Sequence, residues 1–253
     1  MLCLGTPATI EDTTWLRTGF TFALIMQLVL TWCFYARWFF SKEASLSSAR
    51  PQFLLSTVGW FLLSALGNAC RLKQDLGIDL PSMLWGAGGW AYLLAVFSIA
   101  QNLHNFPEDA QSPAMFLLLA PPSVASIALA GITGDFGVGS KAIFGQVLMT
   151  FLLLLNIVHK IGKPSVFGTN WAFVFPLAAC TSAAIRYAAS EDTDGARVLA
   201  WVLFVVEMLV MSLVVVRMVW HHIGVLQGRE SWKDPLLTAP TASSVELHSL
   251  QIT

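Results

Sequence analysis

Residue types that perform covalent chemistry or bind metals are sparse in this sequence, and their spacing does not form an active site. The cysteines show no metal-binding spacing, and they are Cys3, Cys33, Cys70 and Cys180. We interpret them as packing residues rather than as disulfide partners or ligands. His221 and His222 are adjacent, but no third ligand stands near them in the sequence. We therefore expect no catalytic residues, no metal and no cofactor.

A proline-containing apolar stretch points to a different kind of chemistry, the passage of a solute. It begins at Asn170 and Trp171, carries Phe175 and Pro176 side by side, and is predicted to end near Arg186 and Tyr187. The residues between are mostly small. Proline inside a helix removes a backbone hydrogen bond, and lipid offers no substitute for it. This pattern favours a helix that lines a water-filled path over one that faces lipid.

The composition places that helix in a membrane protein. Hydrophobic residues make up 56% of the 253 residues, charged residues only 11%, and the mean hydropathy is +0.67. The formal net charge of -1 gives no basic surface for nucleic acid. We expect an N-terminal segment at 1–14, a transmembrane domain at 15–222 and a disordered tail at 223–253, where polar residues dominate.

Apolar runs of about 20 residues, the length that crosses a bilayer, predict an all-α polytopic protein. The expected spans are 18–36, 51–70, 81–102, 114–132, 142–158, 170–187 and 198–220. The second, fourth and sixth are rich in small residues or interrupted by proline, whereas the first, fifth and seventh are bulky and smooth, and the third is mixed. We therefore expect inner, broken helices wrapped by outer, straight ones.

The lysine and arginine residues in the connections predict the orientation of these spans in the membrane. With the C-terminus in the cytoplasm, eight basic residues lie on the inner side and six on the outer side. This orientation puts the N-terminus and Arg186 outside. We expect a multi-pass protein of the plasma membrane.

Several motifs resemble the plant guard-cell slow anion channel. They are Leu119 to Ala128 with the double proline Pro121 and Pro122, then Asp135, Phe136, Gly137, Gly139, Ser140 and Lys141, then Trp171, Ala172, Phe173, Phe175 and Pro176, and finally Ile185, Arg186 and Tyr187. That channel belongs to the voltage-dependent anion channel family, which also holds tellurite-resistance proteins and fungal malate transporters. The resemblance is specific over about residues 51–187.

The resemblance implies a fold of ten helices, arranged as five hairpins around a central pore with the odd helices lining it. The spans here then correspond to helices four to ten, so the second, fourth and sixth become pore-lining. The first three family helices have no counterpart. We expect either a fragment or a truncated member whose pore other chains complete.

The resemblance also assigns roles to single residues. Phe175 matches the phenylalanine that plugs the pore as a gate, and Arg186 would stand at the outer mouth. The expected pore-lining residues are Ser56, Gly59, Pro121, Pro122, Ser123, Ser126, Pro176 and Thr181. Alternatives remain for each kind: Phe175 as a packed aromatic residue, Arg186 as an interfacial arginine, and the hydroxyl groups, including that of Ser182, as interhelical hydrogen-bond donors.

The function implied is an anion channel that passes small anions such as chloride, nitrate or malate, with the bilayer and other copies or subunits as its partners. The alternatives are a proton-coupled dicarboxylate transporter, a non-conducting subunit of complete channels, and a seven-helix receptor. A retinal protein is disfavoured because every lysine lies at or beyond the edge of a span, Lys141 included.

Overall fold

A computed structural model describes residues 14–40, 53–70, 77–101, 113–156 and 171–226. The chain divides into two compact units, Met1–Val210 and Met211–Thr253, which are described separately. The expected N-terminal segment, up to residue 13, and the expected disordered tail, from residue 227, lie outside the described residues.

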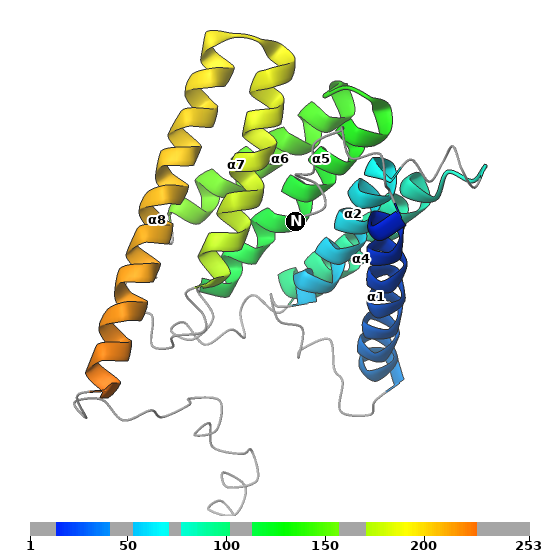
Figure 1. The fold of residues 1–253 in the computed structure, drawn as a ribbon, viewed down its shortest axis with the longest axis horizontal. Helices are drawn as coiled ribbons and strands as arrows, with labels where there is room; N and C mark the ends of the chain where they lie inside the picture. The colour runs from blue at the N-terminus through cyan, green and yellow to red at the C-terminus, as the bar shows by residue number, and fades with distance from the viewer. Residues whose placement is uncertain (1–13, 41–52, 71–76, 102–112, 157–170, 227–253) are drawn as a thin grey trace, which may run out of the picture. The chain divides into compact units, whose positions relative to one another are not determined.

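Every predicted span contains a helix (Figure 1). The elements are α1 (Thr14–Phe40), α2 (Leu54–Ala69), α4 (Leu80–Gln101), the 3-10 helix η5 (Pro113–Leu119), α5 (Ala120–Thr133), α6 (Val138–Leu155), α7 (Trp171–Glu191) and α8 (Asp194–Leu226). Within the described residues, six segments are long and apolar enough to cross a membrane, and α2, with 16 residues, is shorter. The protein is therefore a multi-pass, all-helical membrane protein.

Two helix boundaries differ from the predictions. Lys141 was expected just before the span at 142–158, but α6 already begins at Val138, so Lys141 lies in its first turn. The turn between α5 and α6 is confined to the residues after Gly134, which ends α5 with a left-handed φ of 86° and donates its N–H to the carbonyl of Ala130. α7 continues past Arg186 to Glu191, because the alanines and serine that follow are compatible with a helix.

The helices of the first unit pack as a chain of neighbours. α2 contacts α1, α4 and α5, and α5 in turn contacts α6 and α7. Figure 1 shows α2, α5 and α7 following one another through this unit. The α7 and α8 helices share a core cluster with α6, which includes Ala184, Ala188, Ala200 and Leu203.

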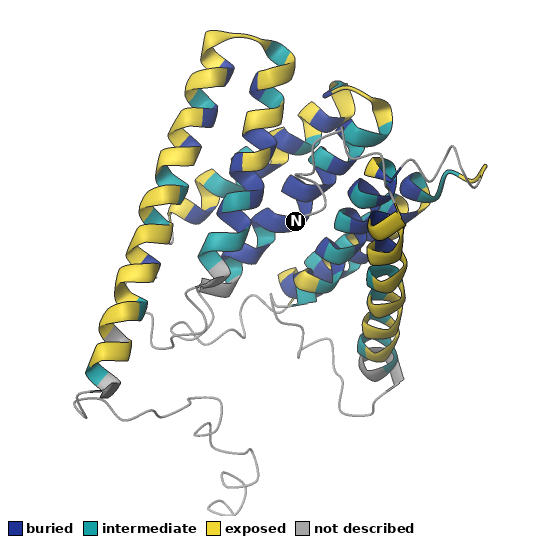
Figure 2. Ribbon diagram, in the orientation of Figure 1, coloured by how far each residue is buried: buried dark blue, intermediate teal, exposed yellow. Residues whose placement is uncertain are grey.

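Burial separates the helices into the two predicted classes. In the apolar window of η5 and α5, 67% of the residues are buried, and the value for α7 is 44%. The outer-type helices have lower values, 6% for α1, 22% for α6 and 17% for α8. In Figure 2 α5 is mostly buried, whereas α1 and α8 are largely exposed. The small-residue pattern therefore predicted correctly which helices other helices cover.

Side chains that donate hydrogen bonds to backbone carbonyls connect neighbouring helices. Asn68 on α2 donates to Gly131 on α5 at 2.6 Å, and Trp85 on α4 donates to Ala125 on α5 at 3.0 Å. The hydroxyl of Ser64 on α2 donates to the carbonyl of Pro81 on α4 at 2.7 Å. Each bond satisfies a polar group for which lipid offers no partner, so these bonds fix the helix positions.

The contact of α1 with α2 depends on one polar side chain in the middle of α1. The amide nitrogen of Gln27 donates to the carbonyl of Ser56 at 2.7 Å and to the hydroxyl of Thr31 at 3.2 Å. A Cβ at Gly59 would collide with the Gln27 amide. Gly59 therefore provides the space that allows Gln27 to reach α2.

We expect Gly59→Ala to lower the free energy of unfolding by about 1 kcal/mol, because the Gln27 amide must leave its partner. The measurement is unfolding of the purified protein in detergent or bicelles. In a Gln27→Ala background the same change should cost nothing, since the methyl group then meets no amide. Equal losses in the two backgrounds would contradict this account of the α1 contact.

The second unit begins within α8, and its described part is helical to Leu226. Large apolar side chains are exposed along it, namely Leu213, Val215, Val216, Val219, Trp220 and Ile223. Such a surface is expected for a helix that faces lipid.

Candidate pore-lining site

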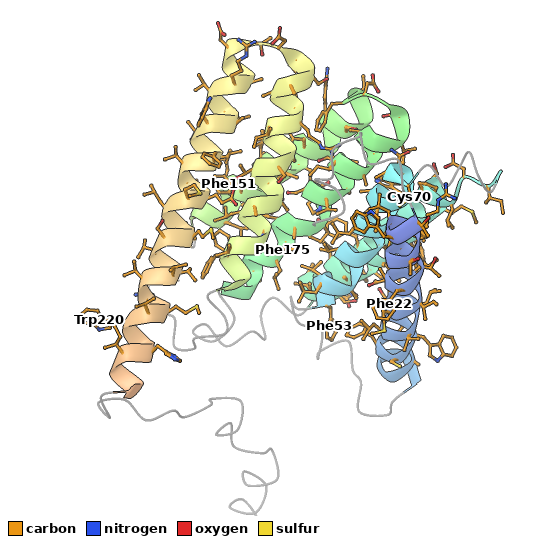
Figure 3. The ribbon with its side chains drawn as sticks, viewed as in Figure 1. Phe22, Phe53, Cys70, Phe151, Phe175 and Trp220 are labelled. Carbon is orange, nitrogen blue, oxygen red and sulfur yellow. The ribbon has the colours of Figure 1, made fainter. Side chains whose placement is uncertain are left out.

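The α7 helix holds the predicted gate and kink in its first half. Pro176 lies inside the helix and is fully buried, and having no N–H it cannot bond the carbonyl four residues earlier. Phe175 is partly buried against a cluster that contains Val58 and Phe61 of α2 and Val124 of α5. Figure 3 shows the position of Phe175 on α7. This cluster holds residues of all three predicted inner helices, and of these α5 is the one that contacts α7 extensively.

One side of α7 is not covered by the described helices. Phe175 and Ala178 are partly exposed, and Ser182, Arg186 and Ala189 are exposed. Spacings of three, four and seven residues put these five residues on one face of a helix, which we call the α7 face. It combines an aromatic ring, small residues, a hydroxyl and a guanidinium. The structure therefore unites Phe175 and Arg186, the predicted gate and mouth, on one surface.

The double proline marks a change of helix type. Residues Pro113–Leu119 form a 3-10 helix, and α5 starts at Ala120 with Pro121 and Pro122 at its first positions. Proline is tolerated there because the first N–H groups of an α-helix have no partner within the helix. Both prolines are buried. The predicted interruption is present, as a junction between two helices rather than as a bend within one.

The hydroxyl groups of α5 that were predicted to line the pore are buried, and each donates a hydrogen bond to a backbone carbonyl. Ser123 donates to the carbonyl of Leu119 at 2.6 Å, and Ser126 donates to the carbonyl of Ser123 at 2.8 Å. Thr181, on α7, is 3% exposed. These three side chains lie among packed helices.

Two further predicted lining residues, Ser56 and Gly59, lie against α1. The Ser56 carbonyl accepts from Gln27, its hydroxyl donates to the carbonyl of Phe53 at 2.7 Å, and Gly59 faces the Gln27 amide. Sequence reasoning missed the connecting roles of Gln27, Asn68 and Trp85. The available signal was a single polar side chain within an otherwise apolar turn, which in a membrane helix must find a partner.

Charged groups gather at the end of α7 and the start of α8. Lys141 of α6 forms an ion pair with Glu191 of α7, and Arg197 pairs with Asp192 and, at 3.3 Å, with Asp194. Asp192 has a φ of 50° and donates its N–H to Ala188, which makes the tight turn between the helices. Arg186 forms no ion pair with any residue that the structure describes.

The Lys141–Glu191 pair predicts a charge-swap result. Lys141→Glu places like charges together and should lower the melting temperature, whereas Lys141→Glu combined with Glu191→Lys should restore most of it. Both side chains are partly exposed, so the free energy of unfolding should fall by less in Lys141→Glu than in Gly59→Ala. A melting temperature of the double variant no higher than that of the single variant would show that the pair does not join α6 to α7.

A groove of about 320 Å³ lies on the first unit between α7 and α8. Its lining residues are Ile185, Ala188, Arg197, Ala200, Trp201 and Phe204. The lining is apolar except for Arg197, which is already paired with two carboxylates. No group of three or more metal-ligating side chains occurs among the described residues.

Comparison with known proteins places the chain in a family. A family-wide sequence profile described as voltage-dependent anion channel matches residues 1–219. The S-type anion channel SLAH3 of Arabidopsis thaliana is 29% identical over 191 residues, which are 74% of this chain and 29% of that protein. The S-type anion channel SLAH2 of the same plant is 29% identical over 205 residues, 77% of this chain and 36% of that protein.

The guard cell S-type anion channel SLAC1 of Arabidopsis thaliana is 27% identical over 170 residues, which are 66% of this chain and 30% of that protein. This chain thus spans about a third of the length of these curated relatives. The matched family profile, in contrast, extends over most of this chain. The chain therefore belongs to the voltage-dependent anion channel family.

Proposed function

We propose that this chain forms part of a channel that passes small anions, such as chloride, nitrate or malate, across the plasma membrane down their gradient. Membership of the family and the names of its relatives, which are S-type anion channels, support this proposal. The observation that carries it is the α7 face, where Phe175 is partly exposed and packs against a cluster that contains residues of α2 and α5. A serine, and an arginine that has no ion-pair partner among the described residues, are unexpected on a surface that faces lipid.

In this proposal Phe175 occludes the path, and Arg186 raises the local anion concentration at the outer mouth. Pro121, Pro122 and Pro176 shape the inner helices, and Ser123, Ser126 and Thr181 lie behind the lining. Selectivity comes from the diameter of the path and a few hydrogen-bond donors. We further propose that helices beyond this sequence, from a longer polypeptide, from other copies or from other subunits, close the path around the α7 face.

Efflux from liposomes tests the proposal. The purified chain is reconstituted into vesicles loaded with potassium chloride, valinomycin supplies the potassium path, and an electrode records chloride release. We expect release above that of protein-free vesicles, and comparable release of nitrate and malate in parallel loadings. Release that requires a proton gradient would assign a coupled transporter instead, and release equal to that of empty vesicles would overturn a conducting role for this chain.

A further inference from the structure

Ser182 differs from most hydroxyl-bearing residues of the structure. Thr57, Ser64, Ser123 and Ser126 are buried and donate to backbone carbonyls at 2.6 to 2.8 Å. Ser182 is exposed on α7, and its hydroxyl makes no hydrogen bond with any residue that the structure describes. Its donor is therefore available to a ligand.

Arg186 differs in the same way from the other cations near it. Lys141 and Arg197 both form ion pairs with carboxylates. Arg186 is exposed, and within the described ranges it has no carboxylate partner. Its full positive charge and its five N–H donors face the space beside α7.

The two free donors lie one helical turn apart. Residues i and i+4 of a helix have Cβ atoms about 5–6 Å apart, and helical side chains lean toward the N-terminus. The long side chain of Arg186 therefore extends over the turn that contains Ser182. Ala178 and Ala189 flank the pair with single methyl groups, so no bulky side chain of the α7 face blocks access to it.

We infer that Ser182 and Arg186 together bind a planar oxyanion group, as found in nitrate and in carboxylates, in preference to a spherical halide. The guanidinium is a flat fork that offers two parallel N–H donors to two oxygens in one plane. The Ser182 hydroxyl then donates to an oxygen of the same ion. A halide has a single centre, so the two parallel N–H groups point to either side of it and both hydrogen bonds are bent. This inference rests on the proposed function, because it names the ligand class of the α7 face.

Competition for chloride tests this binding without any measurement of current. The purified chain in lipid nanodiscs broadens the chlorine-35 NMR line of bulk chloride when chloride exchanges with protein sites. Nitrate, acetate or bromide is then added until the line narrows. We expect nitrate and acetate to be half effective at concentrations about fivefold lower than bromide, a spherical competitor. A preference for nitrate but not acetate would restrict the site to nitrate-like ions, and a preference for acetate but not nitrate would restrict it to carboxylates.

Matched variants separate shape from charge. Arg186→Lys keeps the charge but removes the fork, so the three competitors should become equally effective, whereas Arg197→Lys, a change at a paired arginine, should leave the preference intact. Ser182→Ala should weaken binding of the oxyanions about tenfold, the value of one hydrogen bond to a charged group. Equal potency of bromide in the native protein, or equal results for the two arginine variants, would overturn the inference. A failed efflux experiment with intact oxyanion preference would refute conduction and leave this binding site standing.

Discussion

Phe175→Ala is expected to raise anion efflux through the reconstituted chain by about tenfold, equivalent to the removal of a barrier of about 1.4 kcal/mol. The aromatic ring lies half-buried on the α7 face, against a core cluster to which α2 and α5 contribute residues. Truncation to a methyl group opens the space that the ring fills and leaves the backbone of α7 unchanged. The measurement is the initial rate of chloride release from proteoliposomes with equal protein content.

Phe173→Ala is the matched control, because Phe173 has the same side chain on the same helix two residues earlier. Its ring makes an edge contact with Phe116 of η5, with centroids 4.9 Å apart, and belongs to a different cluster. This variant should lose stability without gaining conductance. Unchanged efflux in Phe175→Ala, or the same increase in both variants, would contradict the assignment of Phe175 as a gate.

Gly88→Leu is expected to destabilise the protein by about 3 kcal/mol, through overpacking between α2 and α4. A Cβ at Gly88 would lie 3.0 Å from the ring of Phe61 and 3.1 Å from the Cβ of Trp60. Phe61 is only 2% exposed and has no free space into which to move. The two helices must then separate. Thermal or denaturant unfolding in detergent measures the loss.

Gly86 and Gly89 supply the comparison on the same helix. A Cβ at either position meets nothing within 4 Å. Gly86→Leu and Gly89→Leu should therefore be nearly neutral, or slightly stabilising through the better helix propensity of leucine. A loss at Gly89 as large as that at Gly88 would show that the effect arises from the glycine itself and not from its contact with Phe61.

The positions of the helices could be predicted from the sequence because a bilayer imposes a strong length and polarity requirement on each span. The distinction between covered and exposed helices could also be predicted. Small residues and prolines are rarely useful against lipid, and the helices that carry them, α2, α5 and α7, are the covered ones. The limits of α6 and α7 were harder to predict, since residues such as Lys141 and Glu191 are compatible with either a turn or a helix.

The environment of single residues within those helices could not be derived from residue type. Ser56 and Gly59 are as small as Ser182 and Ala178, yet the first two lie against Gln27 of α1 and the last two lie on the α7 face. A small residue serves close helix packing and a path wall equally well. Only the rotation of each helix, set by contacts such as Asn68 to Gly131, distinguishes the two roles.

The central claim is that the α7 face borders water and not lipid, and cysteine accessibility tests it most directly. Ser182→Cys and Leu152→Cys are made in a background with Cys3 and Cys33 replaced by serine, since Cys33 is exposed and Cys70 and Cys180 are buried. Leu152 is 57% exposed on the outer helix α6. A charged, membrane-impermeant thiol reagent needs an ionised thiol, which forms in water and not in hydrocarbon. We predict rapid modification at Ser182→Cys and little at Leu152→Cys; equally slow modification at both positions would contradict the claim.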